Sequence, residues 1–146
     1  MPPISAVLLL TAAVTAAVLA TLAALVSRHV HNVNDTEMGR MLQVIPVRYA
    51  LGFSALLAPF TEELFFRGVL VPAFGRRYIT TGVVASAAIF TAAHADQLRG
   101  AAIALVPIAC VGITNAVLRA RSGGITQPWI VHTIYNAALS VSLYFG

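Results

Sequence analysis

Six polar or ionisable residues lie in otherwise apolar stretches, and their spacing suits hydrolytic chemistry. The segment TEELFFR places Glu63 and Arg67 four residues apart. On a helix this spacing puts both side chains on one face with the glutamate on the N-terminal side, which favours an ion pair. Glu62 is rotated about 100° from that pair and has no evident partner on its own helix. A carboxylate in this position could serve as a general base, and a purely structural charge network is the alternative.

Two further segments place histidines in apolar stretches. FTAAH puts Phe90 and His94 on one helical face, and HTIYN does the same for His132 and Asn136. His132 and Asn136 can both donate hydrogen bonds to one point, which is what stabilisation of an oxyanion requires. The alternatives are an interior histidine with satisfied hydrogen bonds at position 94, and polar packing between helices for the other pair.

The elements that hold these residues are expected to be membrane helices. Of the 146 residues, 59% are hydrophobic and 10% are charged, whereas soluble domains have about 25% charged residues. A small soluble protein needs more polar residues than this to cover its surface, so the composition excludes a soluble enzyme, a disordered chain and a disulfide scaffold. The nine basic residues are arginines that lie singly or in close pairs between apolar runs. They fit membrane-flanking anchors and do not indicate nucleic-acid binding.

Five apolar stretches are expected to cross the membrane. They cover about residues 4–26, 41–74, 78–95, 100–118 and 125–145. The second stretch is too long for a perpendicular crossing of a hydrocarbon core about 30 Å thick, so we expect a tilted or broken helix. Pro46, Pro59 and Pro72 provide places for kinks. A cleaved signal peptide is the competing interpretation of the first stretch, although no basic residue precedes it.

The sequence therefore predicts one all-α domain over residues 1–146, a polytopic membrane bundle of about five transmembrane helices. Residues 1–40 form an N-terminal helix and a polar loop, and residues 41–146 form the core that carries the motifs. When depth is counted along the helices from one membrane face, the polar residues of all three motifs lie about 10–22 Å deep. We expect the three motifs to meet in one slab of the membrane.

Taken together, the three motifs resemble those of the CPBP family, which comprises type II CAAX prenyl endopeptidases, Abi proteins and relatives linked to bacteriocin processing or immunity. The family pattern is Glu-Glu-x-x-x-Arg, Phe-x-x-x-His and His-x-x-x-Asn/Asp, in that order. Here it reads EELFFR, FTAAH and HTIYN, within a resemblance that covers about residues 51–143. Members of the family usually have more helices than the five expected here, which suggests a homo-oligomer or a partner subunit.

The resemblance implies an intramembrane endopeptidase whose substrate is a peptide or protein, in some relatives near the C-terminus of a prenylated (CAAX-type) protein. By this resemblance, Glu62 is the general base and His94 its partner, and together they activate a water for attack on a peptide carbonyl. His132 and Asn136 would stabilise the oxyanion.

The same resemblance implies that Glu63 and Arg67 orient the helix, which agrees with their spacing. The family is often described as metalloproteases, and Glu62, His94 and His132 could ligate zinc. A glutamate-activated water without a metal uses the same residues, and the absence of an HExxH motif favours this version. We therefore expect no cofactor, with zinc as the alternative.

Two other functional classes are compatible with a polar cluster in a membrane bundle. One is a non-catalytic module that gives bacteriocin immunity or scaffolds a partner, and the other is a proton-coupled transporter. The presence of all four catalytic candidates favours the peptidase over the module, and the lack of an evident inverted repeat argues against the transporter. We expect an integral, multi-pass protein of the cell membrane that contacts lipid and no nucleic acid.

Overall fold

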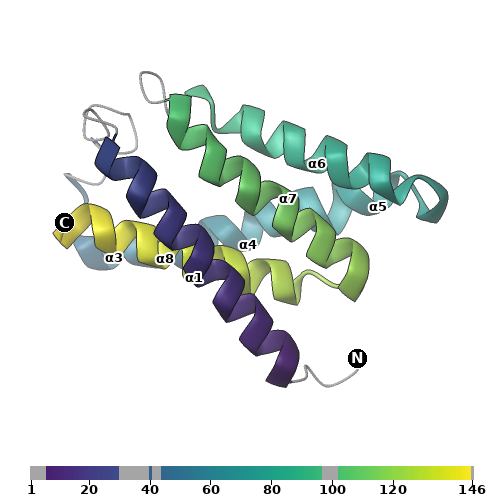
Figure 1. Cartoon of the computed structure of the whole chain (residues 1–146), viewed down its shortest axis with the longest axis horizontal. Helices are drawn as coiled ribbons and strands as arrows, with labels where there is room; N and C mark the ends of the chain where they lie inside the picture. Colours follow the sequence, from purple (N-terminus) through teal and green to yellow (C-terminus); the bar gives the residue numbers. More distant parts are fainter. Residues whose placement is uncertain (1–5, 30–39, 41–43, 97–101, 146) are drawn as a thin grey trace.

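The described part of the chain is helical and contains no strand (Figure 1). The structure, a computed structural model, describes residues 6–29, 40, 44–96 and 102–145. Its four long regular helices are α1 (Ala6–His29), α6 (Ile79–Ala93), α7 (Leu105–Ser122) and α8 (Thr126–Phe145). A fifth, composite helix runs from Val47 to Ala73. The all-α prediction is thus confirmed for the described residues.

The composite helix alternates between α-helical and π-helical turns. Its segments are α3 (Val47–Leu51), η2 (Gly52–Leu57), α4 (Ala58–Glu63), η3 (Leu64–Leu70) and α5 (Val71–Ala73). The sequence predicts a tilted or broken helix here. The chain is helical without a break from Val47 to Ala73, with a π turn before Pro59 and another before Pro72. Residues 41–43 of the predicted stretch lie outside the described residues.

The first π turn leaves a backbone carbonyl in need of a donor. The N–H of Ala58 bonds to the carbonyl of Phe53, five residues earlier. The next bond of this π ladder would join Ser54 to residue 59, but Pro59 has no N–H to donate. Asn136 of α8 supplies a donor instead, because its Nδ2 bonds to the Ser54 carbonyl oxygen over 2.8 Å.

The second π turn repeats this arrangement. The N–H of Val71 bonds to the carbonyl of Phe66, and the next donor in the ladder would be Pro72, which has none. The carbonyl left over belongs to Arg67, and Nε of Arg119 on α7 donates to it over 2.8 Å. A side chain from a neighbouring helix therefore satisfies the carbonyl at each proline, which ties the composite helix to α8 and to α7.

Glycines with positive φ mark two of the turns between helices. Gly75, with φ of 68°, follows the composite helix and precedes η4 (Arg76–Tyr78). Gly123, with φ of 72°, ends α7 and accepts the left-handed conformation without steric cost. Helix α7 begins after η6 (Ala102–Ala104) and extends to Ser122, four residues beyond the predicted end at 118.

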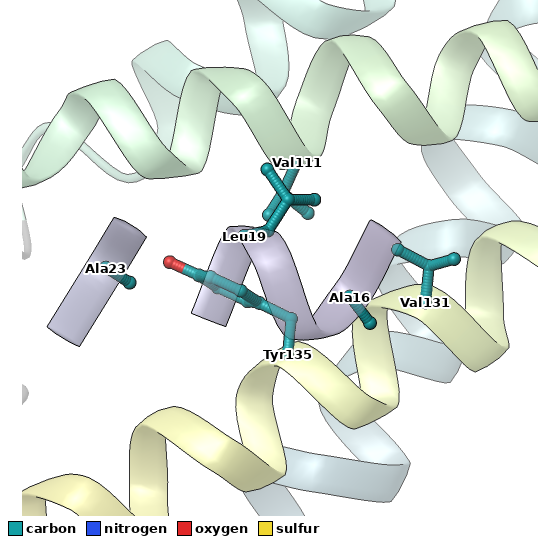
Figure 2. Close-up of a cluster of buried hydrophobic side chains, with 6 residues drawn as sticks. All are labelled: Ala16, Leu19, Ala23, Val111, Val131 and Tyr135. Carbon is teal, nitrogen blue, oxygen red and sulfur yellow. The ribbon is translucent and has the colours of Figure 1, made fainter. Parts of the chain in front are cut away.

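A cluster of buried apolar side chains lies where α1 crosses α8 and α7 (Figures 1 and 2). Helix α1 contributes Ala16, Leu19 and Ala23, and these meet Val111 of α7 and Tyr135 of α8, with Val131 beside them. The alanines of α1 allow its backbone to approach the other two helices closely, as is common between membrane helices. The N-terminal helix is therefore an integral part of the bundle.

Many large apolar side chains point outward from the bundle. Examples on three different helices are Leu10, Phe53 and Val84, each more than half exposed. Among the described residues, Ala102–Ser122 is the one helix that is long and apolar enough to cross a membrane. Exposed apolar surface of this extent is what contact with lipid requires.

Candidate active site

Glu63 lies at the centre of a buried polar cluster that joins three helices. Its carboxylate is completely buried, and Nε of Arg67 lies 3.2 Å from Oε2. On the other side, Asn115 of α7 donates from Nδ2 to Oε1 over 2.9 Å, and Nδ1 of His132 on α8 lies 2.8 Å from the same oxygen. The i,i+4 spacing predicts the Glu63–Arg67 ion pair, and the fold adds a partner from each of two other helices.

Arg67 is also completely buried, and its charge is held from several sides. Its Nη2 donates to the carbonyl of Gly112 over 2.9 Å, and its guanidinium lies 4.5 Å from the centre of the Phe90 ring. Gly112 makes this possible, because a Cβ there would lie 3.1 Å from Phe90 Cδ1. A buried arginine needs such partners, since an uncompensated charge in an apolar interior is strongly destabilising.

Glu62 points to the opposite side of the cluster and approaches two imidazoles. Its Oε2 lies 3.9 Å from Nε2 of His94 and 3.7 Å from Nε2 of His132. The Glu62 and His94 side chains are 28% and 18% exposed, so the group is partly open to its surroundings. Oε2 itself is shielded and has no hydrogen-bond partner among the described residues. A water beside these three atoms could contact all of them, and separations beyond about 3.5 Å call for such a bridge.

In both imidazoles, Nδ1 makes a hydrogen bond on the side away from Glu62, and Nε2 faces Glu62. Nδ1 of His94 lies 2.8 Å from the carbonyl oxygen of Phe90. A carbonyl only accepts, so this Nδ1 carries the hydrogen. Nδ1 of His132 faces the Glu63 carboxylate, which also accepts. With Nδ1 as the donor, a neutral ring presents the lone pair of Nε2 toward Glu62, and a ring with two hydrogens presents an N–H there.

Asn136 occupies the face of α8 that carries His132, one turn further along. Its Nδ2 donates to the Ser54 carbonyl, as described above. The sequence predicts that His132 and Asn136 point their donors at a single position. The structure brings Glu62, His94 and His132 together and gives Asn136 a backbone partner on the composite helix. One N–H of the Asn136 amide is engaged in this way, and the amide group has a second.

Sequence analysis misses three residues of this cluster: Gly112, Asn115 and Arg119. Asn115 is a polar side chain in the apolar stretch of α7, and it is completely buried. That contrast is a usable signal, since a polar residue in such a stretch needs a partner. Arg119 is predicted to be a membrane-flanking anchor, whereas its Nε bonds to the Arg67 carbonyl. Nothing in the local sequence of Gly112 indicates its role.

Glu62, His94 and His132 are the three possible ligands of a zinc ion at this site. Among the described residues, no group of three or more His, Cys, Asp or Glu side chains is placed to hold a metal ion. Zinc ligands lie about 2.0–2.2 Å from the ion, in tetrahedral order. Glu62, His94 and His132 are not arranged as a metal-binding group in this structure.

Comparisons with known proteins match this part of the chain. Residues 43–138 match the sequence model of a family described as type II CAAX prenyl endopeptidase Rce1-like. The matched range contains all three motifs. Over 94 residues the chain is 34% identical to an uncharacterized 24.3 kDa protein of Escherichia coli, a match that covers 62% of this chain and 41% of that protein. The chain thus spans about two fifths of that relative's length. No solved structure matches the chain.

Proposed function

The chain belongs to the Rce1-like family of type II CAAX prenyl endopeptidases, and we propose that it is an intramembrane endopeptidase in which Glu62 activates the attacking water. One observation carries this proposal. The shielded Oε2 of Glu62 has no hydrogen-bond partner among the described residues, and it faces Nε2 of two histidines at 3.7 and 3.9 Å. A carboxylate oxygen that accepts no hydrogen bond from the protein is free to take a proton from a bound water, as general-base catalysis requires.

The proposed reaction begins with a water held by Glu62 and His94. Glu62 takes a proton from this water as its oxygen attacks the carbonyl carbon of the scissile peptide bond. The carbonyl electron pair moves to oxygen and forms a tetrahedral oxyanion. The oxyanion then re-forms the carbonyl as the carbon–nitrogen bond breaks, and Glu62 delivers its proton to the leaving nitrogen. The products are a carboxylic acid and an amine, and the acid passes its proton to the amine or to water.

The oxyanion is proposed to receive hydrogen bonds from His132 and Asn136. Because Nδ1 of His132 donates to Glu63, Nε2 can donate to the oxyanion only when the ring carries two hydrogens. Asn136 would contribute its second amide N–H.

In this proposal, Glu63 and Arg67 position the reacting groups without touching the substrate. Glu63 holds His132 through Nδ1, and Arg67 holds Glu63 and the carbonyl of Gly112. Each of these hydrogen bonds and ion pairs involves a buried group, so the orientation of the His132 imidazole is tightly constrained. Precise support of this kind is what places catalytic groups in a productive geometry.

The wider biological setting is also part of the proposal. We infer a multi-pass protein of the cell membrane in which lipid covers the outward apolar side chains, such as Leu10 and Val84. The substrate would be a membrane-associated peptide or protein, with a prenylated C-terminal segment as the first class to test. A second copy of the chain or a partner subunit would complete the bundle. Zinc remains the alternative to a metal-free mechanism.

The decisive test compares the wild type with Glu62→Gln in a peptide-cleavage assay, with the purified protein in detergent. The amide has the shape of the carboxylate but cannot take up a proton, so we expect at least about a hundredfold loss of kcat with unchanged helix content. Thr61→Val is the matched control, because the Thr61 hydroxyl bonds to carbonyls of its own helix; it should retain activity. Equal cleavage by the wild type and the glutamine variant would remove Glu62 as the base.

A further inference from the structure

Two polar atoms of α8 are shielded from solvent without a hydrogen-bond partner among the described residues: Nε1 of Trp129 and Oγ1 of Thr133. Four residues separate them, so they lie on one face of α8. The Trp129 ring packs edge-on against Phe60, with ring centres 5.6 Å apart. Phe60 precedes Glu62 by two residues on α4. Both atoms therefore lie along the contact between α8 and α4.

This contact is also where the proposed catalytic groups meet. His132 lies between Trp129 and Thr133 in sequence, and its Nε2 is 3.7 Å from Oε2 of Glu62. Of the other shielded side-chain atoms without a hydrogen bond in the described part of the chain, four belong to the charged groups of Glu62, Glu63 and Arg67, and the fifth is Oδ1 of Asn115, whose Nδ2 bonds to Glu63. Nε of Arg67 and Oε2 of Glu63, for example, face each other at 3.2 Å. Trp129 and Thr133 have no such ionic partner, and unpaired buried polar groups are rare enough to need a reason.

We propose that the Trp129 N–H and the Thr133 hydroxyl form a subsite that binds main-chain carbonyl oxygens of the peptide substrate next to the scissile bond. This inference rests on the proposed endopeptidase function. The indole N–H only donates, so its partner must be an acceptor, and a peptide carbonyl is the acceptor that such a substrate brings. Within the described residues of the free protein, both donors are unpaired and shielded, so the substrate must displace the side chains that cover them.

The spacing along α8 keeps both donors within one or two peptide residues of His132. Trp129 precedes His132 by three residues, which is about 4.5 Å along the helix. One residue of an extended peptide advances about 3.3 Å. Neighbouring carbonyls of an extended chain point to opposite sides. If the scissile carbonyl lies at His132, the carbonyl two residues along, about 6.6 Å away, is therefore the one that faces the same side and can meet the indole N–H. The subsite would bind main-chain atoms of the substrate and would not select for particular side chains.

Two variants test the subsite without disturbing the catalytic groups. Trp129→Phe keeps an aromatic ring against Phe60 and removes the N–H, and Thr133→Val keeps the shape and removes the hydroxyl. Each should raise KM about five- to tenfold, which is the effect of losing one hydrogen bond, and should leave kcat near the wild-type value. The thermal midpoint should stay equal or rise, because an unpaired buried polar group has been removed. A merely structural role would lower the midpoint and leave KM unchanged.

Thr91→Val is the control for hydroxyl removal, since the Thr91 hydroxyl bonds to the Ala87 carbonyl within α6 over 2.9 Å. It should leave KM unchanged. If Trp129→Phe fails to fold, benzothienylalanine at position 129 keeps the bicyclic shape and replaces N–H by sulfur. Wild-type KM values in the Thr133→Val variant and in the folded variant at position 129 would overturn the proposal.

Fluorescence gives a second readout that does not depend on cleavage. Trp129 is the one tryptophan of the chain, so its emission reports directly on the subsite. In Glu62→Gln, added substrate peptide should shift the emission to the red and saturate, because the indole N–H gains a partner. A wild type that cleaves no peptide contradicts the proposed function. Normal cleavage combined with an unchanged emission on peptide binding contradicts the subsite alone.

Discussion

Asn136 donates a hydrogen bond to the main-chain carbonyl of Ser54 over 2.8 Å, across the contact between α8 and the composite helix. Pro59 is the reason that this carbonyl needs a donor from elsewhere, since residue 59 would supply the N–H in a continuing π ladder. Asn136, which is proposed to stabilise the oxyanion, is therefore also bonded to the part of the composite helix that precedes Glu62 and Glu63. Asn136 can hold the helix in place and contact the substrate with its remaining N–H.

These two roles of Asn136 can be separated with Pro59. Asn136→Ala should destabilise the protein by about 1–3 kcal/mol, because the hydrogen bond between Asn136 and the Ser54 carbonyl is lost. In a Pro59→Ala background the new N–H at position 59 can serve that carbonyl, so the same change should cost much less. Equilibrium unfolding in detergent measures both values. An equal cost in the two backgrounds would contradict the link between Pro59 and Asn136.

The cleavage rates of the same four proteins test the oxyanion role. If Asn136 stabilises the oxyanion, Asn136→Ala should lower kcat by about a hundredfold whether or not Pro59 is replaced. If Asn136 acts only through Ser54, Pro59→Ala should restore most of the lost rate together with the stability.

Arg119 should act as a support for the ion pair and not merely as a membrane anchor. Its Nε donates to the Arg67 carbonyl over 2.8 Å, so Arg119→Ala should destabilise the protein by about 1–2 kcal/mol. The thermal midpoint in detergent is the measurement. Arg121→Ala is the matched control, because Arg121 is exposed near the same end of α7. Equal effects of the two changes would leave Arg119 with the anchor role alone.

Glu63 and Arg67 should depend strongly on each other. Glu63→Gln leaves the Arg67 charge buried without its counterion, and Arg67→Met does the same for Glu63, so each single change should cost about 3–5 kcal/mol. The double variant should cost clearly less than the sum of the two, since neither charge is then left alone. A double-mutant cycle of unfolding free energies tests this, and strict additivity would show that the two side chains do not interact.

Metal removal separates the two versions of the mechanism. In the metal-free version, cleavage should survive dialysis against a chelator, and the purified active protein should contain zinc at well below one ion per chain. Elemental analysis and the cleavage assay on the same sample provide the check. Stoichiometric zinc that is lost together with activity, and restored together with it, would contradict the metal-free mechanism.

Local spacing was enough to predict part of the site. Glu63 and Arg67 pair because four residues on a helix bring side chains to the same face, whatever the rest of the fold does. For the same reason Glu62 had to point elsewhere. The count of residues along each apolar stretch also predicted that the three motifs lie at similar depth, and Glu62, His94 and His132 do come together.

Contacts between helices were beyond the reach of such counting. Asn115 bonds to Glu63, which is 52 residues away in the chain, and Arg119 reaches Arg67 over the same separation. Which face of α7 meets the composite helix depends on how the whole bundle packs, and helix periodicity alone leaves that rotation open. The sequence also does not predict that Asn136 bonds to the Ser54 carbonyl. This bond depends on a π turn in the composite helix, whereas Asn136 lies on α8.

The sequence by itself determined that this chain is a bundle of apolar helices, where its few charges lie, and which of them share a helical face. These properties follow from composition and from the repeat of the helix. The tertiary structure alone decided which imidazole nitrogen faces Glu62, which side chains serve the carbonyls at Pro59 and Pro72, and which polar atoms of α8 remain unpaired. Each of these depends on the distance and direction between atoms of different helices, and only the packed bundle sets those.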